Sequence, residues 1–318
     1  MEYYSQLNNL RDIENLLPPD RDSFLATGSF GDYFLMFALA VIRSRKKPTN
    51  ILLPEWVLRI IEIFEYDKEN LSVQTYNSAI QGHLHQMIMR RPHYMANPKT
   101  LIPLLSTIYP LVPRLIYNGR LNYINLLCEI YEMEDVDKLP DVKFTELHEQ
   151  EIVAICNKSN IKPNITAIIS IDNNTNPEFS VIFWTNIVKK LQKLGLRCIL
   201  NISQERPEQK FISNLCDGTV KMPPHLVTGI IDYAKYSIGG MNGLMTISSL
   251  FCKQAHIRGL IHTSSNNEHF TLDKFGSLQH LDKYVSNAAA YSKLINTDYI
   301  EYKIPLESDD YIYDIFKK

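Results

Sequence analysis

A single carboxylate follows a glycine-hinged turn early in the chain, and it is the residue best suited to acid–base chemistry. The run Phe24–Phe34 starts with apolar residues, turns at Gly28, Ser29 and Gly31, and places Asp32 where an amphipathic helix should begin. Glycine permits tight turns and lets a ligand approach the backbone closely. A carboxylate there can accept the proton of an attacking hydroxyl, or it can simply stabilise the helix dipole.

A second glycine-rich turn lies far along the chain. A strand is predicted at Tyr236–Gly240, and after Met241 the next helix is expected to occupy Thr246–Phe251. Backbone N–H groups at a helix N-terminus, together with the helix dipole, bind phosphate. The residues predicted to form this phosphate-binding turn are Gly240, Asn242, Gly243 and Leu244.

Two series of alternating strands and helices must position these turns, a pattern typical of parallel α/β sheets. The first series predicts strands at Ser23–Thr27 and Asn50–Leu53 and helices ending at Arg45 and covering Glu55–Phe64. The second predicts strands at Ile165–Ile171, Leu196–Ile202, Thr219–Met222, Tyr236–Gly240 and Asp298–Ile304, and helices at Phe179–Leu194, Phe211–Leu215, Leu226–Ala234 and Leu278–Leu294. Acidic and polar residues fill the stretch between Glu132 and Asn164, so we expect one domain at 1–150 and another at 151–318.

The composition is that of a folded protein with room for two cores. The chain has 318 residues, of which 45% are hydrophobic and 21% charged. A formal net charge of −2, with no basic stripe among aromatic residues, argues against a nucleic-acid partner. Five scattered cysteines favour a reducing, cytoplasmic compartment. We expect neither a leader peptide nor a membrane-spanning segment.

Two basic clusters allow more than one interpretation. The run Arg43–Lys47 falls where the first helix should end, a place that the dipole favours for cations. Alternatively, it faces an acidic acceptor or the anionic inner face of a membrane, with peripheral association there. His83 and His85 lack companion ligands, so we expect no metal. The nearby candidates for acceptor contacts are Arg90, Arg91 and His93, with a solvated loop as the alternative for each.

These segments resemble those of a known enzyme family. The segment Gly28–Asp32 and the apolar helix after it look like the opening motif of the heptosyltransferases, which are family 9 glycosyltransferases of the GT-B type. The segment Ile171–Ile202 is similar to the start of that family's donor domain, and Tyr236–Leu250 to its donor phosphate turn. The resemblance implies an α/β GT-B fold with two Rossmann-like domains facing a central cleft. Residues 1–150 would bind the acceptor and residues 151–318 the nucleotide-sugar donor.

The resemblance also implies an activity. It predicts an inverting, metal-independent glycosyltransferase without a cofactor, which moves a sugar from a nucleotide-sugar donor to a glycan or lipid-linked glycan acceptor in cell-surface polysaccharide or lipopolysaccharide synthesis. Asp32 matches the catalytic base, and Gly28, Ser29 and Gly31 fall on the acceptor side. Asn173, Met222 and Pro223 join the predicted donor-binding residues. Met222 and Pro223 would bracket the nucleobase, or they form an ordinary loop after a strand.

Two other functions remain open. The family has an Asp and a His in its second turn where this chain has Met241 and Thr246, which favours a non-catalytic nucleotide- or glycan-binding protein of the same fold. The retained Gly31 and Asp32 argue against such a loss of catalysis. The third hypothesis is a GT-B-type sugar-nucleotide epimerase, which would turn over its substrate without an acceptor.

Overall fold

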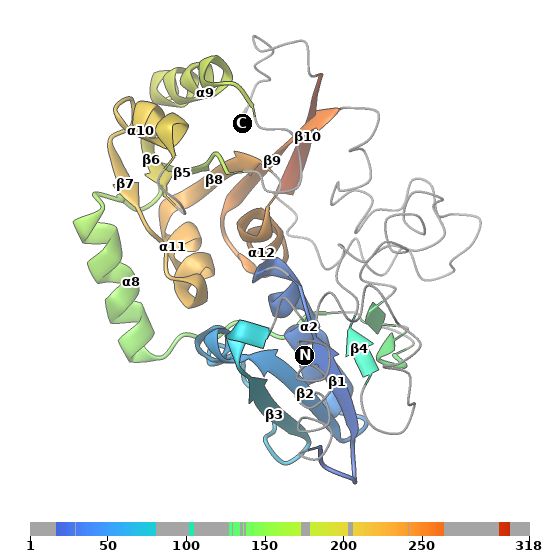
Figure 1. Cartoon of the computed structure of the whole chain (residues 1–318). Coiled ribbons are helices and arrows are strands. Elements are labelled where there is room, and N and C mark those ends of the chain that lie inside the picture. The colour runs from blue at the N-terminus through green and yellow to red at the C-terminus, as the bar shows by residue number, and fades with distance from the viewer. Residues whose placement is uncertain are drawn as a thin grey trace. The chain divides into compact units, whose positions relative to one another are not determined.

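The chain forms two compact units, and the boundary between them falls between Val142 and Lys143 (Figure 1). The computed structural model describes residues 17–28, 30–80, 102–104, 127–128, 130–133, 136, 138–172, 179–202, 206–240, 242–263 and 299–305. Position 150, where the sequence analysis ends its first domain, lies inside helix α8 (Glu146–Lys158).

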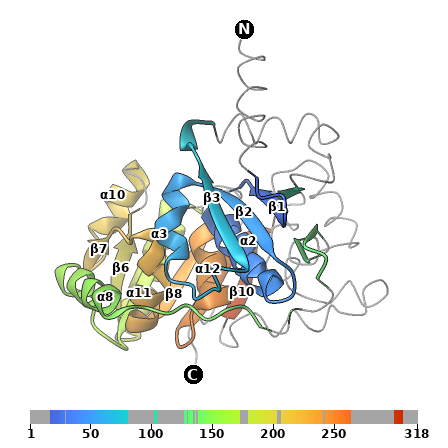
Figure 2. The same ribbon diagram turned by 90° about the horizontal axis from the view of Figure 1, so that it is seen from below.

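Unit 1 is built on a four-stranded parallel sheet in the order β3-β2-β1-β4. Its strands are β1 (Asp22–Ala26), β2 (Thr49–Pro54), β3 (Leu71–Tyr76) and β4 (Ile102–Leu104). Its helical elements are α2 (Phe30–Ser44), α3 (Leu58–Ile61) and 3₁₀ turns at Glu55–Val57 and Ser78–Ile80. Helix α2 packs on β2 and β3, and Figure 2 shows β1, β2 and β3 side by side with α2 on one face of them.

The core of unit 1 explains why α2 is apolar on nearly every side. Nearly all of its residues are buried, which is expected of a helix covered on more than one face. Phe34 and Phe37 pack against Phe64 with ring centroids 5.7 Å and 5.6 Å away. The helix predicted at Glu55–Phe64 is wrong in length, because α3 ends at Ile61 and Phe64 pairs with Val142 in a β-bridge.

Unit 2 is built on a six-stranded parallel sheet in the order β10-β9-β8-β5-β6-β7. Its strands are β5 (Thr166–Ser170), β6 (Arg197–Asn201), β7 (Gly218–Val220), β8 (Lys235–Gly240), β9 (His256–Thr263) and β10 (Tyr299–Pro305). Counted along the chain from β5, this is the 3-2-1-4-5-6 order of doubly wound nucleotide-binding folds. The strand order therefore reverses between β5 and β8.

Helices cover both faces of the second sheet. They are α9 (Val181–Lys193), α10 (Pro207–Ser213), α11 (Val227–Ala234) and α12 (Gly243–Phe251), with a 3₁₀ turn at Pro224–Leu226. Helix α9 packs with α10, whereas α11 packs with α12 and α8, and Figure 1 shows the two groups on opposite sides of the sheet. Helix α9 begins where the Ser180 hydroxyl accepts the Phe183 N–H, and it ends before Gly195, whose φ of 81° only glycine adopts easily.

Two elements of unit 2 were not predicted. Helix α8 buries only Ile152 and Cys156, so its sequence shows little apolar periodicity. Its start is fixed instead by a capping box between Thr145 and His148. Strand β9 was missed as well, although its residues Ile257 and Leu260 are fully buried.

Two predicted helices begin earlier than expected. Helix α10 starts at Pro207 rather than at Phe211, because proline is well suited to the first helical position. Helix α12 starts at Gly243 rather than at Thr246, because Asn242 caps it. The helix predicted at Leu278–Leu294 lies outside the described residues.

Candidate functional site

The two glycine-rich turns occupy equivalent places in the two sheets. In unit 1, β1 lies between β2 and β4, and the turn that follows β1 carries Asp32. In unit 2, β5 lies next to β8, and Asn242 follows β8. Open parallel sheets bind ligands outside the carboxyl ends of their strands, where the strand order reverses. Each predicted turn therefore lies where a sheet of its kind binds a ligand.

The Asp32 turn, residues 27–33, packs a carboxylate against a glycine. Asp32 lies in the first turn of α2 and is only 7% exposed. A Cβ added to Gly28 would lie 2.7 Å from both the Cβ and Oδ2 of Asp32, closer than real side chains approach. Gly28 is therefore required by this close approach, and any side chain there must displace Asp32.

Two tyrosines that the sequence analysis did not single out hold this turn. The Gly28 N–H donates to the Tyr33 hydroxyl at 3.2 Å, and the Tyr76 hydroxyl donates to the Ala26 carbonyl at 2.9 Å. Burial raises the pKa of both phenols, so both stay neutral near pH 7. The position of Tyr33 directly after Asp32 was the only sequence signal that could have identified it as part of the turn. No sequence feature distinguished Tyr76 from an ordinary core residue.

The predicted acceptor residues are only partly described. Gly31 is buried within α2, and the Gly28 N–H is bonded to Tyr33. Contact of Gly28 and Gly31 with an acceptor stays a prediction. Four acceptor candidates lie outside the described residues: Ser29, Arg90, Arg91 and His93. His83 and His85 lie outside them as well.

The Asn242 turn, residues 240–246, joins α12 to the end of β5. The Asn242 Oδ1 accepts the Met245 N–H at 3.0 Å, which caps the helix. Its Nδ2 donates to the Asp172 carbonyl at 2.6 Å and to the Ser170 hydroxyl at 3.3 Å. The side-chain amide is thus engaged at both ends.

The backbone of the same turn remains available to a ligand. The first N–H groups of a helix have no partner within it, and Asn242 satisfies only that of Met245. Within the described part of the chain, no hydrogen bond involves the N–H groups of Gly243 or Leu244. These two groups, and not the Asn242 amide, are suited to receive an anion.

Gly239 sets the spacing between the two strands at this edge. A Cβ there would lie 2.7 Å from the Ser170 carbonyl oxygen and 3.1 Å from the Met245 sulfur. The neighbouring Gly240, which the sequence predicts to belong to the phosphate-binding turn, is the buried last residue of β8. Gly239 is therefore the residue that lets β8 lie close to both β5 and α12.

An oriented carboxylate follows β5. Asp172 is 7% exposed, and the Gln209 side chain donates to its Oδ1 at 2.7 Å. Beside them lies a cavity of about 20 Å³, enough for one water molecule, lined in part by Trp184 and Arg206. The Gln209 Oε1 is buried and has no hydrogen-bond partner within the described structure. Neither Asp172 nor Gln209 is among the residues predicted from the sequence to form a site.

The predicted nucleobase residues are described in part. Met222 follows β7, is 8% exposed, and donates its N–H to the Asn201 side chain at 3.5 Å. Pro223 precedes the 3₁₀ turn at Pro224–Leu226. Both lie near the carboxyl edge of the sheet, and their contact with a base stays a prediction. Asn173 lies outside the described residues.

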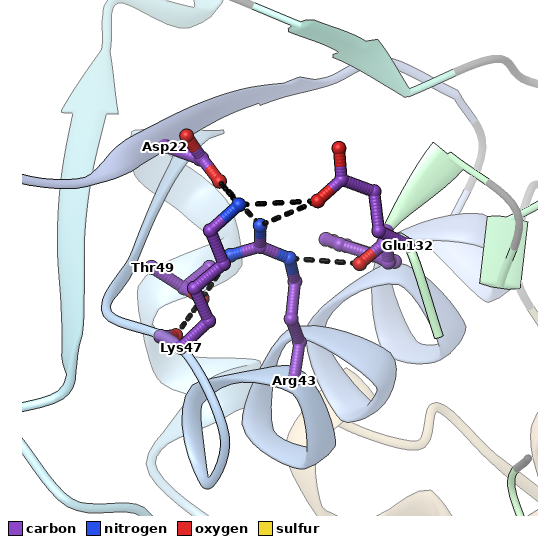
Figure 3. A network of polar contacts seen from close by, with 6 residues as sticks. Asp22, Arg43, Lys47, Thr49 and Glu132 are labelled. Atoms are coloured by element: carbon purple, nitrogen blue, oxygen red, sulfur yellow. Dashed lines mark hydrogen bonds and ion pairs between the residues drawn. The ribbon is translucent and has the colours of Figure 1, made fainter. Parts of the chain in front are cut away.

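The basic run at the end of α2 forms an ion-pair network at the opposite edge of the first sheet (Figure 3). Arg43 is 3% exposed and donates to Asp22, to the Thr49 hydroxyl at 2.7 Å and to the Tyr131 carbonyl at 2.8 Å. Lys47 pairs with Asp22 at 2.8 Å and with Glu132 at 3.1 Å. These contacts support the structural interpretation of Arg43 and Lys47.

The network shifts the pKa values of Asp22 and Lys47. Partial burial of Asp22 acts to raise its pKa, but hydrogen bonds from Lys47 and Arg43 outweigh it and hold the pKa below its ordinary value. Hydrogen bonds to Asp22 and Glu132 raise the pKa of Lys47. Both ions are therefore favoured in the folded protein.

Among the described residues, no three His, Cys, Asp or Glu side chains lie close enough to hold a metal ion. No helix in the same ranges is long and apolar enough to cross a membrane.

The comparisons with known proteins concern the fold. No protein-family model and no curated protein matches the sequence. The structure is similar to that of ADP-heptose lipopolysaccharide heptosyltransferase II from E. coli, with a TM-score of 0.53 and 12% identity over 89% of this chain and 90% of that one. It is also similar to a family 9 glycosyltransferase from Veillonella parvula DSM 2008, with a TM-score of 0.56 and 12% identity over 91% and 87% of the two chains. These likenesses confirm the predicted heptosyltransferase-like GT-B fold.

Proposed function

We propose that this protein is a glycosyltransferase that moves a sugar from a nucleotide-sugar donor to a glycan or lipid-linked glycan, with inversion and without a metal ion. The observation that carries the proposal is the buried Asp32, which follows the strand where the order of the first sheet reverses. The fold shared with two glycosyltransferases supports it. In our proposal, unit 1 binds the acceptor and unit 2 binds the donor.

Asp32 is the proposed general base. An inverting transfer forms a bond from the acceptor oxygen to the anomeric carbon while the bond to the nucleotide breaks, and the acceptor must lose its proton. Asp32 lies in the first turn of α2, where the helix dipole favours negative charge. Such a base contributes about 10²–10⁴-fold to a rate.

The N-terminus of α12 is the proposed site for the donor diphosphate. The N–H groups of Gly243 and Leu244 would hold the phosphate oxygens and stabilise the charge that develops as the nucleotide departs. Asn242 would act indirectly, because its amide already ties the helix to β5. With backbone N–H groups binding the diphosphate and Asn242 holding the helix, the site does not need the acidic residue that heptosyltransferases have in their second turn.

Nucleotide release from a panel of sugar nucleotides, measured with and without glycan acceptors, tests the proposal. Asp32→Asn should lower acceptor-dependent release at least about 10²-fold. Thermal stabilisation by the matching nucleoside diphosphate should persist, because the variant keeps its fold and its donor site. Asp20→Asn removes an exposed carboxylate of the same unit and should keep full activity. Undiminished turnover by Asp32→Asn would refute the assignment of the base.

A non-catalytic binding protein of the same fold is the second candidate. One observation favours it, because the Thr246 hydroxyl, at the position of the family's His, donates to the Asn242 carbonyl at 3.1 Å inside the helix. Thermal stabilisation by a nucleotide, with neither transfer nor hydrolysis across the full panel, would support this candidate.

A further inference from the structure

The two tryptophans of the chain differ sharply in exposure. Trp184 is 2% exposed and belongs to the hydrophobic core of unit 2. Trp56 is 40% exposed. The exposed part of the Trp56 indole is a flat aromatic surface on which a ligand can pack.

Trp56 lies at the edge of the sheet that carries the candidate base. It belongs to the 3₁₀ turn Glu55–Val57, which directly follows the carboxyl end of β2, and β2 pairs with β1. Ligands of open parallel sheets bind outside this edge. The exposed indole and the Asp32 turn therefore follow neighbouring strands at the same end of unit 1.

The indole packs next to the Asp32 turn. The Tyr33 ring meets it edge to face, with centroids 5.3 Å apart and an interplanar angle of 89°. The Tyr33 hydroxyl also accepts the Gly28 N–H, and the next residue in the chain, Val57, is fully buried. The Tyr33 side chain thus connects the exposed indole to the turn that carries Asp32.

The surroundings of Trp56 suit a sugar better than a purely apolar ligand. Leu58 is 39% exposed, and Glu55 and Arg59 on the same short segment are exposed as well. A pyranose ring presents C–H groups on its faces, which pack on a flat aromatic surface, and hydroxyls around its rim. Carboxylate and guanidinium groups supply the acceptors and donors that such hydroxyls need.

We propose that Trp56 is a stacking platform for a sugar ring of the acceptor. The assignment rests on the proposed function, because it takes the acceptor to be a glycan. Trp56 binds and orients the ring, Tyr33 holds the indole, and neither takes part in proton transfer. Lost stacking should weaken acceptor binding about tenfold while the chemical step continues.

Fluorine NMR of the full chain labelled with 5-fluorotryptophan tests the platform without any turnover. The spectrum has two tryptophan signals, and Trp56→Phe assigns them. The probes are short oligosaccharides of glucose, galactose, N-acetylglucosamine and heptose. We expect at least one of them to shift the Trp56 signal and leave that of Trp184 in place. Binding should weaken about tenfold in Trp56→Ala. If no probe shifts the Trp56 signal, or if binding is unchanged in Trp56→Ala, the platform is refuted.

Transfer kinetics separate this inference from the proposed function. Trp56→Ala should raise the KM for the acceptor about tenfold with little change in kcat, and Trp56→Phe should recover part of the loss. Phe211→Ala removes an aromatic side chain that is 53% exposed in unit 2 and should change neither parameter. Asp32→Asn should keep oligosaccharide binding. Oligosaccharide binding at Trp56 without any transfer would uphold the platform and refute the transferase.

Discussion

The Asp32 turn and the Asn242 turn share a topology but have opposite chemistry. Each follows a strand beside the point where the order of a parallel sheet reverses. In the first, side-chain hydroxyls bond the backbone and a carboxylate packs against the turn. In the second, a side-chain amide bonds both flanking elements, and backbone N–H groups remain for a ligand. The same architecture thus presents a buried carboxylate in one unit, which we propose as the proton acceptor, and a capped helix end in the other, which we propose as the phosphate site.

The glycines of the two turns differ in the same way. Gly28 faces a side chain, that of Asp32, whereas Gly239 faces the backbone oxygen of Ser170. A side chain can move aside when a methyl group is added, but a strand backbone within a sheet cannot move without disturbing its neighbours. Equivalent substitutions should therefore damage function in unit 1 and stability in unit 2.

Gly28→Ala should have the largest effect on activity. The added methyl group must displace the Asp32 carboxylate, and a shift of about 1 Å in a catalytic group costs about 10²-fold in rate. Steady-state kinetics should show this loss in kcat, with nucleotide stabilisation unchanged. In the Asp32→Asn background the same change should add almost nothing, because it acts through Asp32. Additive losses would show that Gly28 acts independently of the carboxylate.

Gly239→Ala should lower stability by about 1–3 kcal/mol, because overpacking against backbone forces β5 and β8 apart. Chemical denaturation of the whole chain measures this loss. Gly195→Ala is a poor control, since its φ is 81° and the substitution is strained in any case. Ser213→Ala, on an exposed helix end, is the better matched change. Full stability of Gly239→Ala would mean that the two strands can separate at little cost.

Asn242→Ala should lower stability by about 1 kcal/mol through the lost helix cap and should also abolish nucleotide stabilisation. The second effect is expected because α12 loses its tie to the Asp172 carbonyl and its N-terminus is no longer held. Asn242→Ser separates the two roles, since a serine caps the helix but cannot reach Asp172. If Asn242→Ser binds nucleotide as the native protein does, the tie to β5 is not needed for the donor site.

The sequence was sufficient to predict the elements whose apolar pattern is strong. Helix α9 and strands β1, β5 and β6 follow such patterns, and all are found within two residues of their predicted bounds. Helix α8 was missed because its contacts are few and its start depends on a cap between two polar residues. Local pattern predicts an element only when burial, rather than capping, determines it.

Candidate site residues were predictable only where glycines mark a turn. The positions of Asp32 and Asn242 followed from the glycines around them. The contacts of Tyr76 and Gln209 did not, because Tyr76 reaches Ala26 across 50 positions of the chain and Gln209 reaches Asp172 across 37. Such pairs are brought together by the strand order, which a single sequence does not reveal.

The ion pairs at the amino edge of unit 1 should make the smallest contribution, and it should depend on pH. The folded state lowers the pKa of Asp22, so the resulting stability is present above the ordinary Asp pKa of about 4 and is lost as pH falls through the folded value. The gain should be below about 1 kcal/mol, because Asp22 is 36% exposed and solvent screens the pair. Thermal melts should show a steeper loss of Tm below about pH 4 for the native chain than for Asp22→Asn. As a control, Glu208→Gln removes a carboxylate from unit 2 and should leave the dependence of Tm on pH unchanged. If Asp22→Asn also leaves this dependence unchanged, the network adds no acid-sensitive stability.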